Sequence, residues 1–188
     1  TVTADNITLI ANAGDIGANG AAINVTTGAA GALNVTATGS DIFITSASDL
    51  TVATIVTENA QSDTVQLTTT GAANLTLTGT TSLAGIATDI FDLNTETGTL
   101  TIQDNAISVS VFDVDTAGGN VVFTEATSAS FSYNVNTLGG SFDSSTASIS
   151  GTAAGEDVAI DTSNTGGVNA GNISLGALDD TDGNFLND

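Results

Sequence analysis

A short apolar–polar–apolar triplet recurs along the whole chain, and this pattern limits the fold more than any other feature of the sequence. Apolar side chains at every second position are typical of a β-strand that buries one face. Clusters of Gly, Asn, Asp and Ser separate the triplets, most of which start roughly 8 to 16 residues apart. The pattern predicts many short strands, joined by tight turns, with little helix. The triplets occupy residues 7–9, 23–25, 33–35, 42–44, 50–52, 65–67, 75–77, 100–102, 109–111, 121–123, 131–133, 147–149, 158–160 and 173–175.

Two all-β architectures fit this pattern: a parallel β-helix, or solenoid, of roughly 20-residue coils, and an antiparallel β-sandwich. A solenoid stacks Thr and Asn into ladders on successive coils. A sandwich of this size more often has aromatic residues in its core and Asn-Gly turns in its hairpins. Trp is absent, aromatic residues make up 4% of the chain, and Asn19-Gly20 is the one Asn-Gly dipeptide. We therefore predict a single β-solenoid segment over residues 1–188, with the antiparallel β-sandwich as the alternative.

Charge excludes several classes of function. The 188 residues include 21 Asp and Glu but no Lys, Arg, His or Cys, so the net charge is −21. Such a surface repels nucleic acid and anionic lipid, and we expect no nucleic-acid partner. No stretch approaches the 18 or so apolar residues of a membrane-spanning helix, so we expect no membrane insertion. The first residue, Thr1, and the absence of Met predict a segment of a longer precursor.

The stretch 6–55 resembles a known family of exported proteins. It reads NITLIANAGDIGANGAAINVTTGAAGALNVTATGSDIFITSASDLTVATI. The segments AGDIG, INV, ALNVTATGSDIFI and DLTV are similar to the repeat regions of filamentous-haemagglutinin-type exoproteins of bacterial two-partner secretion. The resemblance implies a right-handed parallel β-helix in a large adhesin that folds outside the cell, and hence an extracellular or bacterial cell-surface location. Later coils match only in the style of their repeats.

We expect a structural shaft segment of a large bacterial cell-surface adhesin or extracellular filament, which provides reach and surface attachment. Its expected partners are neighbouring segments of the same chain or identical subunits, together with host or surface glycans. One alternative is a calcium-dependent surface-layer or filament subunit. Another is a carboxylate-only module that binds or cleaves glycans.

The densest acidic cluster is DDTDGNFLND at the C-terminal end, and it predicts a calcium site. Alternating carboxylate and amide oxygens around a glycine turn are suited to a hard cation. The spacing does not match an EF-hand, and a solvated turn between coils is the alternative interpretation. Asp113 and Asp115 flank Val114 and are expected on the outer face of one strand. The predicted calcium ligands are Asp179, Asp180, Asp182, Asn184 and Asp188.

Enzymatic activity is not expected. β-Helices that cleave polysaccharides work with paired carboxylates, and Glu156-Asp157 and Asp179-Asp180 are the acidic dipeptides here. The chain lacks the His, Lys and Arg side chains that such sites use as bases and clamps, and nothing is present to activate a Ser or Thr nucleophile. Five Asn-x-Thr/Ser sequons are candidate glycan sites or products of strand alternation, at Asn6, Asn24, Asn34, Asn74 and Asn172.

Overall fold

The computed structural model describes residues 1–38, 41–57, 62–83, 90–103, 106–108, 111–123, 127–128, 132–136, 141–151, 158–162 and 171–180. These residues form strands, turns and bends, and no helix occurs among them. All strand pairs that they form are parallel, so the chain winds in stacked coils rather than folding back as hairpins. The predicted β-solenoid is confirmed, and the antiparallel β-sandwich is wrong.

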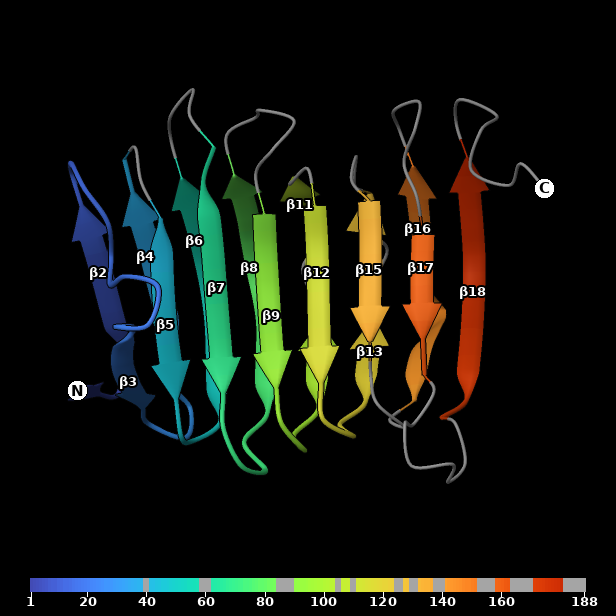
Figure 1. The fold of residues 1–188 in the computed structure, drawn as a ribbon, viewed down its shortest axis with the longest axis horizontal. Helices are drawn as coiled ribbons and strands as arrows, with labels where there is room; N and C mark the ends of the chain where they lie inside the picture. The colour runs from blue at the N-terminus through green and yellow to red at the C-terminus, as the bar shows by residue number, and fades with distance from the viewer. Residues whose placement is uncertain are drawn as a thin grey trace.

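Two sheets face each other along the axis, and we call them the front and back sheets because one lies nearer the viewer in Figure 1. The chain runs down the front sheet, up the back sheet and advances from left to right, which is right-handed winding (Figure 1). The front sheet contains β1 (Val2–Ala4), β3 (Ile23–Thr27), β5 (Ile42–Ser46), β7 (Thr64–Thr69), β9 (Ile90–Thr95), β12 (Val111–Thr116), β15 (Ser132–Asn136) and β17 (Val158–Asp161). The back sheet contains β2 (Ile7–Ala11), β4 (Leu33–Ala37), β6 (Leu50–Thr57), β8 (Leu75–Leu83), β10 (Leu100–Ile102), β11 (Ala106–Ser108), β13 (Val121–Phe123), β14 (Thr127–Ser128), β16 (Phe142–Gly151) and β18 (Ile173–Asp180).

The core consists of apolar side chains that stack in columns from coil to coil. In the back sheet one column is formed by residues that pair in register and are each 0–1% exposed: Leu50, Leu75, Leu100, Val121 and Phe142. In the front sheet the matching column is Ile44, Leu67, Leu93 and Val114. Burial of each such side chain contributes about 1.5–3 kcal/mol. The apolar positions of the triplets between residues 7 and 102 therefore line the interior.

A ladder of polar side chains joins successive coils at the turn that enters the back sheet. Asp49 Oδ1 accepts a hydrogen bond from Asn74 N at 2.8 Å, and Asn74 Oδ1 accepts one from Thr99 N at 2.8 Å. In the same way, Asn6 Oδ1 accepts a hydrogen bond from Ala32 N, and Asn120 Oδ1 accepts one from Ser141 N. These partners lie 21 to 26 residues apart, so the coils are somewhat longer than the 20 residues expected. The ladder fixes the register of each turn on the next.

A second column, of buried hydroxyl groups, lies at the ends of the front strands β5, β7, β9, β12 and β17. Thr95 Oγ1 donates a hydrogen bond to Gly98 O at 3.1 Å, and Thr116 Oγ1 donates one to Gly119 O at 2.7 Å. Ser46, Thr69 and Thr162 make the equivalent bond to a carbonyl of their own turn. The glycines in these turns are required by close backbone approach, because a Cβ at Gly98 would collide with Ala73 O and one at Gly119 with Gly98 O.

Candidate functional site

The strongest candidate site lies on the outer face of the front sheet, where acidic and amide side chains of β7, β9 and β12 are aligned. Gln66 pairs with Asp92, Asp92 pairs with Asp113, and Asn94 pairs with Asp115. Adjacent parallel strands lie about 4.8 Å apart, so these side chains neighbour one another along the axis. We call Gln66, Asp92, Asn94, Asp113 and Asp115 the acidic face.

Hydrogen bonds hold Asp92 at the centre of the acidic face. Gln66 Nε2 donates to Asp92 Oδ2 at 2.8 Å, and Asn94 Nδ2 donates to Asp92 Oδ1 at 2.6 Å. Both carboxylate oxygens of Asp92 are thus satisfied by amides of its own and the neighbouring strand. Because the sequence has no cationic side chain, neutral donors stabilise this charge, and at Asp92 they include two side-chain amides.

The surroundings of Asp115 on the acidic face disturb the ionisation of its carboxyl. Partial burial, followed by repulsion from Asp92, raises the pKa of the Asp115 carboxyl above its usual value of 3.8. Both causes disfavour the charged form. A raised carboxyl pKa is common at functional sites, but the same shift arises wherever like charges stack on a sheet.

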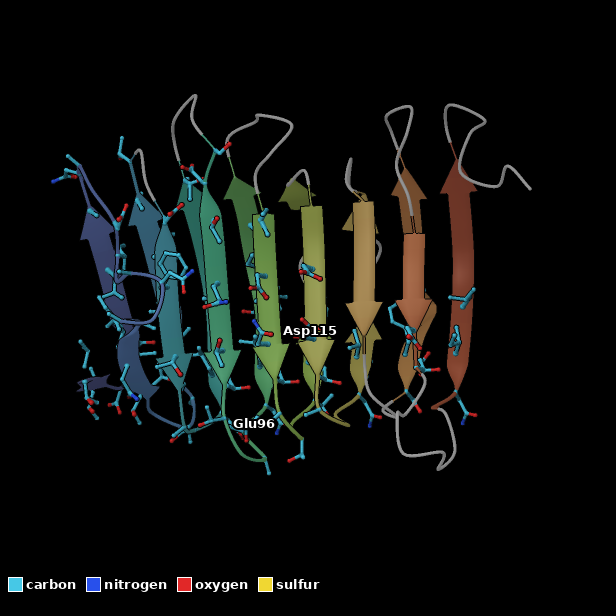
Figure 2. All side chains as sticks on the ribbon, viewed as in Figure 1. Glu96 and Asp115 are labelled. Carbon is cyan, nitrogen blue, oxygen red and sulfur yellow. The ribbon has the colours of Figure 1, made fainter. Side chains whose placement is uncertain are left out.

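A shallow hollow of about 280 Å³ adjoins Asp115 at the lower edge of the front sheet. Figure 2 shows Asp115 on the face of β12 and Glu96 in the turn that follows the neighbouring strand β9. Glu96 Oε2 accepts a hydrogen bond from Gly71 N at 2.6 Å, so this carboxylate also fastens one turn to the previous one. The lining residues are Thr68, Thr69, Asn94, Thr95, Glu96, Asp115, Thr116 and Ala117. A second hollow, of about 310 Å³, lies at the corner formed by Thr27, Gly28, Ala29, Ser48, Asp49 and Thr51.

Carboxylate, amide and hydroxyl groups make the first hollow compatible with hydroxyl-rich ligands or hydrated cations. Its lining includes no aromatic side chain on which a sugar ring would stack. Within the described part of the chain, acidic side chains nowhere gather in a group of three or more that would hold a metal ion. The acidic face is therefore a row of stacked charges and not a converging cage.

The predicted calcium ligands are only partly described. Asp179 and Asp180 are the last two residues of β18, where they pair with Ser150 and Gly151 of β16. Asp182, Asn184 and Asp188 lie outside the described residues, as does the dipeptide Glu156-Asp157. The calcium site stays a prediction.

Sequence reasoning placed Asp113 and Asp115 on one strand face, and the structure agrees, with the exposed outer face of β12 carrying both. It missed their partners Asp92 and Asn94 on the preceding coil. A signal was present, because the same pattern of aromatic, Asp or Asn, aliphatic, Asp or Asn, Thr begins at Phe91, Phe112 and Tyr133. These three segments align in register in β9, β12 and β15.

The described part of the chain contains no helix with the length and apolarity that crossing a bilayer requires. No protein-family model, curated protein or solved structure matches the chain. The likeness of residues 6–55 to two-partner-secretion exoproteins therefore remains an expectation from the sequence.

Proposed function

We propose that this chain is a structural shaft segment of a large bacterial cell-surface adhesin or extracellular filament. Its role is reach and attachment, and it performs no chemistry. The observation that carries the proposal is the uniform stacking of core, corner and hydroxyl columns from coil to coil. Such columns extend a rod, since each added coil lengthens it by about 4.8 Å.

The carboxylates Asp92, on the acidic face, and Glu96, in the turn after β9, support this reading. Asp92 accepts hydrogen bonds from two side-chain amides, and Glu96 accepts one from a backbone N–H of the adjacent turn. These carboxylates have roles in holding coils together. An exterior rich in Asp and Thr also suits a protein that must stay soluble outside the cell.

The proposed partners are neighbouring segments of the same chain or identical subunits, and surface glycans at the attachment site. Exposed apolar side chains on the terminal coils support the first two kinds of partner, neighbouring segments of the same chain or identical subunits. Val2 pairs with the buried Val25 and is itself 39% exposed, and Ile173 pairs with the buried Phe142 and is 48% exposed. A further coil stacked on either strand would cover these side chains and pair the strand edges.

Deletion of one coil tests the shaft role. Leu50 and Leu75 occupy the same position on successive coils, so removal of residues 50–74 joins Asp49 to Leu75 and preserves the corner. A shaft tolerates this change: cells that express the full-length protein should still display it, as measured by antibody labelling of intact cells. A deletion of 12 residues within the same range breaks the register and serves as the control.

Two results would contradict the proposal. One is labelling that appears only after the cells are permeabilised. The other is turnover of any polysaccharide by the purified chain that disappears in Asp115→Asn or in Asp179→Asn, because a shaft has no catalytic residue to lose.

A further inference from the structure

A loop at residues 17–22 interrupts strand pairing in the front sheet. On one side of it Ile16 pairs with Ile42, and on the other Ile23 pairs with Ile44. The single residue Phe43 of β5 therefore lies opposite the whole loop. The loop belongs to the blue connection between β2 and β3 in Figure 1. Its two ends are fixed by strand pairing, while residues 18–21 are exposed.

The tip of this loop is a two-residue turn with Asn19 and Gly20 at its centre. Ala21 N donates a hydrogen bond to Ala18 O at 2.8 Å, and Ala18 N donates one to Ala21 O at 3.3 Å. Neither bond uses the N–H of Gly20. At Gly20, where φ is +76°, an added Cβ would meet no heavy atom within 4 Å beyond the neighbouring residues in the chain. The Asn19 side chain and the Gly20 nitrogen are thus adjacent and exposed, with open space around them.

We propose that this turn makes Asn19 a site of spontaneous deamidation. The Gly20 nitrogen gives up its proton and attacks Cγ of Asn19, the bond from Cγ to the amide nitrogen breaks, and ammonia leaves with that proton. The product is a cyclic succinimide. Water then adds to one of the two ring carbonyls that flank the nitrogen and breaks the bond between them, which leaves aspartate or isoaspartate at position 19. Glycine favours the attack because it has no side chain to hinder it. The reaction needs no enzyme and does not depend on the proposed function.

The asparagines of the corner ladder are protected against the same reaction. Asn74 Oδ1 accepts a hydrogen bond from Thr99 N at 2.8 Å. The nitrogen that would attack Cγ, Leu75 N, donates to Thr99 O at 3.0 Å. The nitrogens that follow Asn6 and Asn120 are bonded to the next coil in the same way. Attack by any of these nitrogens would break a hydrogen bond between coils, so the structure distinguishes Asn19 from them.

Deamidation should leave the fold intact because the loop lies outside the stacked core. It adds one carboxylate to a chain whose net charge is −21, and isoaspartate lengthens the main chain of the turn by one methylene. Both changes fall between the paired residues Ile16 and Ile23. We expect the modified chain to keep its β-type circular dichroism, with a Tm within about 4 °C of the unmodified value.

Peptide mass spectrometry after incubation of the full chain at neutral and at mildly alkaline pH tests the proposal. Cleavage before aspartate releases residues 15–40, which contain Asn19 together with Asn24 and Asn34 as internal references. Conversion adds about one mass unit, and fragmentation of the N–Cα bonds distinguishes isoaspartate from aspartate. We expect conversion at Asn19 to be at least about tenfold faster than at the two references. The rate should rise with pH, because the attacking nitrogen must lose a proton. Asn19→Gln keeps an amide but requires a larger ring, and should suppress the reaction.

Thr97→Asn separates the effect of the turn from that of the dipeptide. This substitution places asparagine before Gly98, which is buried and so close to Ala73 O that a Cβ would collide with it. The turn therefore lacks room for ring closure, and the introduced side chain should convert at least about tenfold more slowly than Asn19 in the same variant. Three outcomes would overturn the proposal: conversion at Asn19 no faster than at the references, an Asn19 that converts in urea but stays intact in the folded chain, and equal rates at positions 19 and 97.

Discussion

At the scale of single residues, two buried threonines differ in whether their hydroxyl has a hydrogen-bond partner: Thr95 in the hydroxyl column and Thr57 at the end of β6 in the back sheet. Thr95 is 4% exposed and donates to Gly98 O, whereas Thr57 is fully buried and its Oγ1 has no hydrogen-bond partner among the described residues. Thr95→Val leaves a carbonyl without its donor and should lower the free energy of unfolding by about 1–3 kcal/mol. Thr57→Val keeps the shape, removes a desolvated hydroxyl, and should leave stability unchanged or raise it. Urea denaturation of the two variants measures the difference, and Thr95→Ser, which keeps the donor, is the control. A larger loss in Thr57→Val would contradict this account.

Asp115 should make the fold less stable at neutral pH than at mildly acidic pH. Burial and Asp92 raise the pKa of its carboxyl, so the folded chain binds this proton more tightly than the unfolded chain does. Stability therefore falls as the pH rises from the usual value near 3.8 through the raised pKa, and the whole penalty is present above it. Asp115→Asn should remove this fall and stabilise the protein at pH 7 by no more than about 0.5 kcal/mol, because solvent screens this largely exposed carboxyl.

The measurement for Asp115 is the free energy of unfolding at several pH values between 4 and 7. Asp49→Asn is the control, because it removes one charge from the corner and keeps a side-chain oxygen for Asn74 N. If both variants change the pH dependence equally, the effect belongs to net charge and not to the neighbourhood of Asp92.

Some residue roles followed from the sequence and some did not. Alternation identified the inward positions, since a period of two is enough to place Leu50 and Val52 on the buried face. The sequons at Asn6, Asn74 and Asn172 have a structural origin: Asn occupies the corner, the next residue begins the back strand, and Thr or Ser follows on it. The role of the corner side chains required the stacking of coils, which local sequence does not contain.

At the scale of strands, positions were predictable and registers were not. Most triplets fall within strands, but the pairing shifts between Val52 and Thr54 on β6, where Thr54 pairs with Thr80 of β8. Two residues of β8 lie in that interval against one residue of β6, and a Cβ at Gly79 would collide with Ala53 O. Such bulges depend on how one coil lies on the next, so they have no signature within a single strand.

The two faces of β5 give a direct test of strand orientation. Ile42 is fully buried and Thr45 lies on the outer face. Ile42→Asp places an unpaired charge in the core and should lower the free energy of unfolding by at least about 3 kcal/mol. Thr45→Asp adds the same charge to the same strand and should cost no more than about 0.5 kcal/mol. Chemical denaturation followed by circular dichroism measures both, and similar losses would mean that the assigned faces are wrong.

At the scale of the whole molecule, composition predicted the architecture because it disfavoured the alternative all-β fold, the antiparallel sandwich. Few aromatic residues and a single Asn-Gly dipeptide disfavoured a sandwich, while repeated short strands rich in Thr and Asn favoured stacked coils. The acidic face could not be assembled in this way. Asp92 and Asp113 become neighbours only when the coil between them has its actual length, and coil length varies along the chain.

The whole-molecule charge also bears on the predicted calcium site at residues 179–188. If Asp180 and Asp182 bind calcium with the millimolar-range affinity of extracellular modules, about 10 mM calcium stabilises the fold by about 1.4–2.7 kcal/mol, or about 3 to 10 °C in Tm. Sodium at the same ionic strength screens the charges but does not add the stabilisation that a bound calcium ion would give. We therefore expect a higher Tm in calcium than in matched sodium or chelator, and we expect Asp180→Asn with Asp182→Asn to abolish the difference.

The control is Asp113→Asn with Asp115→Asn, which removes equal charge from the front sheet and should preserve the difference in Tm between calcium and sodium. Identical melting curves in calcium and sodium would mean that the cluster is a solvated turn and not a calcium site, because a cation that binds the folded state must stabilise it.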